Sequence, residues 1–170
     1  MASVERATER SAPDQRFLLH GISWKTYESL VADLRDRCAP RMTYDQGSLE
    51  LMAPSRAHER YKRLLGQLIT FWAVEKEVPI HGGGSTTFRR EDLDRGLEPD
   101  ECFYLRNEPL VRGKDEIDLS LDPPPDLVVE VELSRNSLDK MRIYAALGVP
   151  ELCRFDGETL IVYELAADGQ

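Results

Sequence analysis

The segment Pro123–Ser134, PPPDLVVEVELS, decides the fold because it predicts a strand that is covered on both faces. Apolar, mostly β-branched residues follow a run of prolines and precede the polar stretch Ser-Arg-Asn-Ser, a pattern typical of an interior strand. Glu130 interrupts the apolar run. Because burying an unpaired carboxylate is very costly, Glu130 must be exposed at the strand's end, neutralised, or held by a cation. The last of these possibilities predicts a metal site.

The composition bounds the number of domains and the kind of partner. With 170 residues and 41% apolar content, the chain can bury one sizeable core, which predicts a mobile polar leader over residues 1–15 and a single domain over 16–170. The net charge of -9, from 22 basic and 31 acidic residues, disfavours a protein whose main role is to grip duplex nucleic acid. It leaves room for an enzyme that collects carboxylates around metals and confines its basic residues to one groove.

Cysteine spacing and hydropathy give expectations about redox chemistry and location. Cys38, Cys102 and Cys153 are widely spaced and form no Cys-x-x-Cys pair, so neither a disulfide framework nor a structural zinc site is predicted. We expect core residues or free thiols. The first residues lack an apolar signal core, and no apolar run approaches the roughly 20 residues needed to span a bilayer. The sequence therefore predicts a cytoplasmic protein.

Periodicity and turn signals predict the order of elements. Helices are expected over 23–38, 55–77 and 137–147, hairpins over 41–52 and 151–164, strands over 85–90, 98–105 and 126–133, a turn at 82–84 and a loop over 106–122. The long helix begins at the N-cap Ser55 and carries a mostly apolar stripe. The stripe consists of Ala57, Tyr61, Leu64, Leu65, Leu68, Phe71, Trp72 and Glu75. This order predicts an α/β (α+β) fold with a central mixed sheet flanked by helices.

Two carboxylates and an amine stand at positions that suit phosphodiester hydrolysis. Asp100 belongs to one predicted strand, Glu130 to the next, and Lys140 to the helix that follows. Hard oxygen ligands hold Mg²⁺ or Mn²⁺, which polarises a phosphoryl group and lowers the pKa of a bound water. A lysine can orient that water or offset developing charge. The set predicts a metal-dependent hydrolase.

Several short motifs carry a resemblance to a known family. They are Pro54-Ser55 with His58-Glu59, Glu98-Pro99-Asp100, Pro125–Val131, Ser137–Lys140, Tyr144 and Gly148–Glu151. Their order and spacing resemble the Uma-two family of restriction-endonuclease-like proteins over nearly the whole chain after residue 20. The resemblance implies a restriction-endonuclease-like core of the PD-(D/E)XK superfamily, a divalent metal (Mg²⁺ or Mn²⁺) and cleavage of DNA.

The resemblance also implies residue roles. Asp100 corresponds to the aspartate of the Pro-Asp pair and Glu130 to the acidic residue of the third motif, so both are expected metal ligands. Glu59 is a further expected metal contact. Glu132 stands where the superfamily has its lysine, so Lys140 is expected to supply the cation from the next helix, as a four-carbon stem permits. Small nucleases of this superfamily often work as homodimers, which predicts a dimer.

Each of these residues also has an interpretation without chemistry. Asp100 taken alone is a capping aspartate at the start of a strand. Glu130 could instead form a buried ion pair with Arg89 or Arg142. Lys140 could equally be a solvated helical residue.

The start of the long helix and the surface cations can likewise be interpreted in two ways. The helix dipole favours Glu59 without any function, and His58 is expected to be structural or to support a ligand. Basic residues could line a groove along a nucleic-acid backbone, although scattered surface cations are commoner; they are Arg60, Lys62, Arg63, Arg89, Arg90 and Arg95. The acidic balance and Glu132 favour a second function for the protein, a catalytically weak or inactive binding or assembly module.

Overall fold

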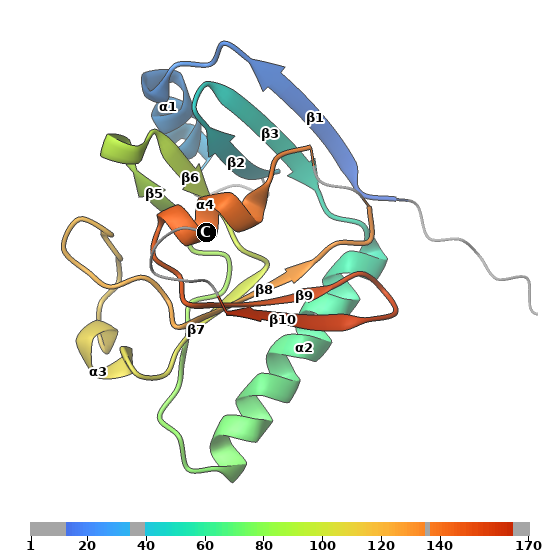
Figure 1. Ribbon diagram of the computed structural model, residues 1–170, viewed down its shortest axis with the longest axis vertical. Helices are drawn as coiled ribbons and strands as arrows, with labels where there is room; N and C mark the ends of the chain where they lie inside the picture. Colours follow the sequence, from blue (N-terminus) through green and yellow to red (C-terminus); the bar gives the residue numbers. More distant parts are fainter. Residues whose placement is uncertain (1–12, 35–39, 135–136, 165–170) are drawn as a thin grey trace, which may run out of the picture.

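The computed structural model describes residues 13–34, 40–134 and 137–164, which form two five-stranded sheets with helices around them (Figure 1). The helices are α1 (Trp24–Leu34), α2 (Arg56–Glu75), α3 (Glu108–Val111) and α4 (Lys140–Ala146), with a short 3-10 helix at Glu91–Leu93. This α/β architecture confirms the predicted restriction-endonuclease-like fold class. The sequence suggested one central sheet, whereas the described residues form two.

The first sheet is wholly antiparallel and has the strand order β1-β3-β2-β6-β5. Its strands are β1 (Gln15–His20), β2 (Arg41–Asp45), β3 (Ser48–Ala53), β5 (Phe88–Arg90) and β6 (Arg95–Leu97). Helix α1 covers one face, where Tyr27 stacks on Tyr44 with ring centroids 4.8 Å apart. The β2–β3 hairpin forms as predicted, because Gln46 and Gly47 take the positive φ angles of 46° and 87° that its tight turn needs.

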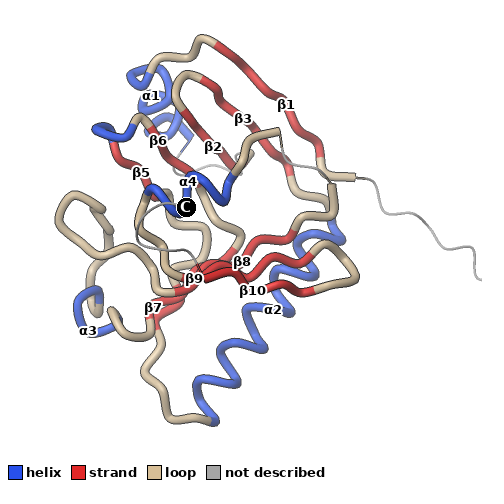
Figure 2. The backbone as a smooth tube through the Cα atoms, viewed as in Figure 1, coloured by secondary structure: helices blue, strands red, loops and turns tan. Residues whose placement is uncertain are grey.

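The second sheet is mixed and has the order β10-β9-β8-β7-β4. Its strands are β4 (His81–Gly82), β7 (Glu101–Tyr104), β8 (Leu127–Val131), β9 (Glu151–Phe155) and β10 (Leu160–Glu164), and β8 pairs in parallel with β9. Helices α2 and α4 lie on opposite sides of this sheet (Figure 2). All five residues of β8 are buried, so the predicted strand covered on both faces is confirmed.

Helix α2 begins where the sequence predicted, but its apolar stripe does not face the sheet. The Ser55 side chain accepts the backbone N–H of His58 at 3.2 Å, as an N-cap does. The buried residues of α2 are His58, Gly66 and Ala73, whereas most large apolar residues of the stripe are exposed. Small Gly66 and Ala73 let the helix approach the sheet closely, and Leu65 and Ile69 pack beside them. The stripe thus remains on the outer face.

Several elements differ from the sequence prediction. Strands β1, β4 and β6 and helix α3 were not predicted, because they are short or lack clear alternation. Helix α4 begins at Lys140 rather than 137, since Asp139 caps it by accepting the Arg142 N–H at 3.3 Å. The predicted end of the first helix at Cys38 lies outside the described residues. The expected leader reaches to residue 15, yet Asp14 is buried and β1 begins at Gln15.

Two of the three cysteines are core residues, as expected. Cys102 packs in the cluster under α4, and Cys153 in the cluster under α2. None of the helices in the described ranges is long and apolar enough to cross a bilayer.

Candidate active site

Asp100 and Glu130 lie on neighbouring strands of the second sheet. Asp100 directly precedes β7, and Glu130 is the fourth residue of β8. The pairing of Glu101 with Val129 and of Cys102 with Val128 places Asp100 across from Glu130 when the register is continued by one residue. Residues that face each other on antiparallel strands project to the same side of the sheet. Both are buried, with exposed fractions of 0% and 4%, so two carboxylates share one buried region.

The Asp100 carboxylate has three polar partners. Its Oδ2 accepts the backbone N–H of Val131 at 2.6 Å, and its Oδ1 lies 2.8 Å from His58 Nε2 and forms an ion pair with Arg41. The capping interpretation is therefore only partly right. The backbone donor belongs to the neighbouring strand, and the arginine supplies a charge that a turn aspartate does not need.

Glu130 is bound by two side chains of α4. Lys140 Nζ donates to Glu130 Oε2 at 2.7 Å, and the Tyr144 hydroxyl donates to Oε1. Lys140 is only 6% exposed, so its interpretation as a solvated residue is wrong. The alternative ion pair of Glu130 with Arg89 or Arg142 is also wrong. The partner is Lys140, because α4 folds back over β8 and places its first residue next to Glu130. Tyr144 follows Lys140 by four residues, a spacing that puts both side chains on one helical face.

Arg41 joins Glu59 to Asp100. Besides its contact with Asp100, Arg41 donates from Nη2 to Glu59 Oε1 at 2.8 Å. The Arg41 side chain is 9% exposed and that of Glu59 48% exposed, which places Glu59 at the rim of the site. Sequence reasoning missed Arg41. It belongs to β2 of the first sheet, and no local pattern indicates that the two sheets meet there.

His58 lies between two carboxylates. Its Nε2 contacts Asp100 and its Nδ1 lies 3.1 Å from Asp14 Oδ2, while Asp14 Oδ1 accepts the Ser55 N–H at 2.8 Å. Burial lowers the pKa of His58, and the Asp14 carboxylate opposes that shift. A neutral imidazole carries one N–H and can donate to only one carboxylate. The second contact requires another proton, on the ring or on a carboxyl group.

Acid should remove the contribution of Asp14 to stability. Burial raises the pKa of Asp14, but the hydrogen bond from the Ser55 backbone and the field of His58 outweigh it and leave the pKa below its ordinary value of 3.8. The stabilisation is therefore complete above about pH 4 and is lost as the pH falls through the lower folded-state pKa. We expect Asp14→Asn to lower the free energy of unfolding at pH 7 by about 1–2 kcal/mol. Urea unfolding from pH 7 to pH 3 should show a shallower acid decline in the variant; an unchanged slope would contradict this.

Two cavities lie in the part of the chain around the site, and Glu130 lines the smaller of them. The smaller, about 430 Å³, opens beside Glu130 and Lys140 and is lined by charges of both signs, including Glu132, Asp139 and Arg154. Glu130 and Lys140 line it although they are only 4% and 6% exposed.

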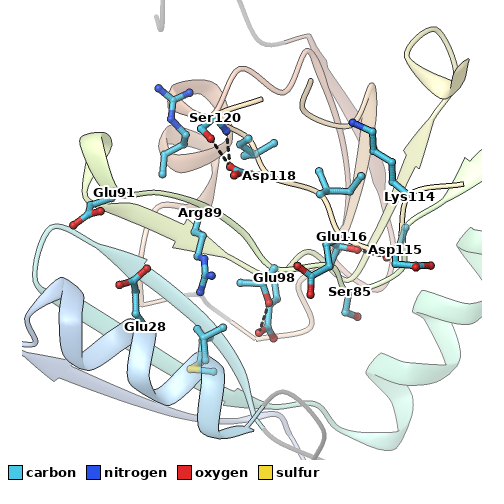
Figure 3. Close-up of a pocket in the computed structure, with 18 of the residues that line it drawn as sticks. Glu28, Ser85, Arg89, Glu91, Glu98, Lys114, Asp115, Glu116, Asp118 and Ser120 are labelled. Carbon is cyan, nitrogen blue, oxygen red and sulfur yellow. Dashed lines mark hydrogen bonds between the residues drawn. The ribbon is translucent and has the colours of Figure 1, made fainter. Parts of the chain in front are cut away.

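The larger cavity, about 1200 Å³, is bounded by α1, β5 and the loop 114–120 (Figure 3). The side chains of Glu28, Arg89 and Glu98 point into it. Burial raises the pKa of Glu98, which lies two residues before Asp100. The lining is predominantly acidic, with Glu91, Asp92, Asp115, Glu116 and Asp118 among its residues. Such a lining repels phosphate, so this cavity is a poor seat for a nucleic-acid backbone.

The basic residues considered for a groove have varied surroundings. Arg90 pairs with Asp92, Arg95 pairs with Asp45 at 2.8 Å, and Lys62 donates to Ser85 at 3.0 Å. Burial and the nearby Arg41 lower the pKa of Lys62. Two of these cations are therefore already neutralised within the chain.

The carboxylate oxygens of the site are ligands of the type that hard cations bind. Within the described ranges, no group of three or more His, Cys, Asp and Glu side chains could by itself hold a metal ion. A carboxylate offers about four lone-pair positions on its two oxygens. Three on Asp100 and two on Glu130 are already engaged, which leaves one position on Asp100 Oδ2 and two on Glu130. These oxygens could hold Mg²⁺ or Mn²⁺ if water completes the coordination.

Comparison with known proteins identifies the family of the chain. No curated protein matches the chain. Residues 24–170 match the family Uma2, which is described as "Putative restriction endonuclease". This match covers the whole constellation from Arg41 to Tyr144, although Asp14 lies before it. The chain belongs to the Uma2 family, within the PD-(D/E)XK superfamily.

Proposed function

We propose that the protein is a metal-dependent endonuclease that hydrolyses DNA phosphodiester bonds. Family membership indicates a nuclease-like function. The observation that carries the finer proposal is the pair of buried carboxylates, Asp100 and Glu130, on adjacent strands beside Lys140. A buried charge cluster of this kind is costly to maintain and is typical of functional sites.

The residues of the chain have separable tasks in this proposal. Asp100 and Glu130, with Glu59 at the rim, would hold Mg²⁺ or Mn²⁺, which when bound polarises the scissile phosphoryl group and acidifies a bound water. Lys140 uses one of its three N–H donors on Glu130 and keeps two for orienting the attacking water. His58 and Arg41 fix the rotamer of Asp100. Addition of water across the P–O3′ bond then leaves a 5′-phosphate and a 3′-hydroxyl.

The direct test combines metal binding with cleavage. Purified protein should bind Mn²⁺ in calorimetry and should nick supercoiled plasmid or cut single-stranded DNA with Mg²⁺ or Mn²⁺. EDTA should abolish the cleavage. Protein that binds Mn²⁺ but cuts neither substrate would retain the metal site and overturn the proposed activity, and protein that does neither would overturn both.

A second candidate function is a binding or assembly module without catalysis. Arg41 and Lys140 already neutralise Asp100 and Glu130, so the cluster is satisfied without a metal. Glu132 occupies the position of the superfamily's lysine, and it lies 3.6 Å from Arg154 Nε. Under this function the site carboxylates stabilise the fold only. Neutral substitutions there would change the stability of the protein, and neither the wild type nor the variants would cleave DNA.

Tyr144 is expected to position Glu130. Burial raises the pKa of Tyr144 well above its ordinary value, and Glu130 adds to the shift, so the hydroxyl stays protonated and keeps donating. Tyr144→Phe removes the hydroxyl that donates to Glu130 Oε1. We expect this loss to lower the free energy of unfolding by about 1–3 kcal/mol. We expect weaker Mn²⁺ binding and slower cleavage that saturating Mn²⁺ partly restores. A variant with unaltered Mn²⁺ affinity would argue against this role.

The same proposal includes a homodimer. Two copies related by a two-fold axis would give each strand of a DNA duplex its own site.

A further inference from the structure

The outer face of α2 carries four large apolar side chains in one stripe. Leu64, Leu68, Phe71 and Trp72 are 49%, 56%, 69% and 52% exposed. Their spacing of four, seven and eight residues from Leu64 places them on one helical face, opposite the buried Gly66 and Ala73. We call these four residues the α2 stripe. The C-terminal half of α2 projects past the second sheet, so the stripe is not covered by that sheet (Figure 1).

The edge strand β10 extends the apolar area. Val162 pairs with Cys153, and Cys153 packs in the cluster that contains Leu65 and Ile69 of α2. Directly paired residues project to the same side, so Val162 lies on the α2 side of the sheet, and Leu160 shares that side by alternation. They are 57% and 49% exposed. These two residues therefore add exposed apolar surface on the α2 side of β10, which is an edge strand among the described residues.

The combined area is large enough for a stable interface. The exposed parts of the α2 stripe amount to on the order of 450 Å² in each copy, and Leu160 with Val162 brings the total for two copies to about 1,200 Å². A specific protein interface needs about 1,000 Å² or more in total, and the share of one copy, about 600 Å², is at the upper end of the largest apolar patches on monomers, which are often functional.

We propose that the occupant is a second copy of this chain, whose α2 packs antiparallel on the first across a two-fold axis near Leu68. In that register residue numbers facing each other sum to about 135. Leu64 then faces the partner's Phe71, and Leu68 lies near the axis. Arg60 faces the partner's Glu75, and both residues are exposed on the same helical face as the stripe. Two opposite-charge pairs thus close the two ends of the apolar contact.

The charge pattern favours a second copy of this chain over a different protein as the partner. Arg60 and Glu75 have no ion-pair partner among the residues the structure describes. They stand at equal distances from the centre of the stripe, four residues beyond Leu64 and Phe71 respectively. A two-fold operation exchanges the two ends, so each positive end meets a negative one. The stripe is self-complementary in apolar area and in charge.

The pairing keeps the two candidate sites apart. His58 lies at the start of α2, so an antiparallel pair separates it from the partner subunit's His58 by about 28 Å along the helix axis at 1.5 Å per residue. Dimerisation therefore needs no site residue. Its test stands independently of the nuclease activity.

Sedimentation velocity of the full chain from low micromolar to near-millimolar concentration tests the interface. Wild type should sediment as a dimer at the higher concentrations. Leu68→Glu, which sets two glutamates close to the axis, should be monomeric throughout. Leu121→Glu is the matched control, because Leu121 is 85% exposed and lies in a loop away from α2, and it should leave the dimer intact.

Charge reversal tests the register. Arg60→Glu and Glu75→Arg should each weaken the dimer several-fold, since each creates like-charge pairs, and the combined R60E/E75R variant should restore wild-type affinity. Far-UV circular dichroism of each variant verifies the fold. A monomeric wild type overturns the proposal and leaves the stripe to a different protein; a dimer that L68E does not disrupt overturns the interface; a double variant as weak as the single ones overturns the antiparallel register.

Discussion

Glu130→Gln is expected to lower the rate of metal-dependent DNA cleavage by on the order of 1,000-fold, because it removes the charge that would hold the metal and leaves Lys140 misdirected. The amide has nearly the same shape as the carboxylate, but its single oxygen can replace only one of the two acceptors that Tyr144 and Lys140 now use. Single-turnover cleavage of a labelled oligonucleotide at saturating Mn²⁺ measures the chemical step. Asp100→Asn should behave alike.

The control must separate lost chemistry from lost folding. Glu151→Gln makes the same chemical change at an exposed position of β9, the strand next to β8, and should cut DNA at the wild-type rate. Far-UV circular dichroism should show that both variants are folded at the assay temperature. If folded Glu130→Gln cuts as fast as Glu151→Gln, Glu130 is structural and the cleavage does not depend on it. If neither the wild type nor Glu151→Gln cuts DNA, the binding-module function is preferred.

Lys140→Met is expected to destabilise the protein by about 3–5 kcal/mol, because it leaves Glu130 as a buried carboxylate without its cation. The side-chain exposures of Lys140 and Glu130 are 6% and 5%, so water can replace the lost partner only poorly. Urea unfolding at pH 7, followed by circular dichroism, measures the loss. Lys25→Met supplies the comparison, since Lys25 is exposed on α1 and should shift the unfolding free energy by less than about 0.5 kcal/mol.

A double-mutant cycle separates the ion pair from the packing. The variant E130Q/K140M removes both charges and should recover much of the stability that Lys140→Met loses, because a neutral pair no longer buries an unpaired charge. Its cleavage activity should stay absent. If the losses of the two single variants simply add, the pair is not coupled, and the 2.7 Å contact does not govern the stability of β8.

The sequence located the carboxylates better than their partners. The apolar run around Glu130 predicted a strand covered on both faces, and β8 is one. The partner of Glu130 was sought among arginines, since no pattern in one strand specifies which side chain of the next helix will fold back over it. Lys140 and Tyr144 are four residues apart, and this spacing is the signal that could have identified the pair.

Contacts between distant segments could not be read from local patterns. Asp14 and Arg41 belong to stretches around β1 and β2, and each reaches the site only because the two sheets pack together. The stripe on α2 illustrates the same limit. Periodicity identifies an apolar face, but it does not tell whether that face packs on its own chain or remains available for another.

The contacts of Arg41 also have a consequence for the folding of the protein. It projects from the first sheet and contacts Asp100 of the second and Glu59 of α2, so one guanidinium ties three separate segments together. Until those segments dock, neither the orientation of Asp100 nor the rim position of Glu59 exists. A chain with undocked sheets therefore keeps Asp100 and Glu130 on one sheet but lacks the Arg41 contacts that connect Asp100 to Glu59, so the arrangement is complete only once the tertiary structure has formed.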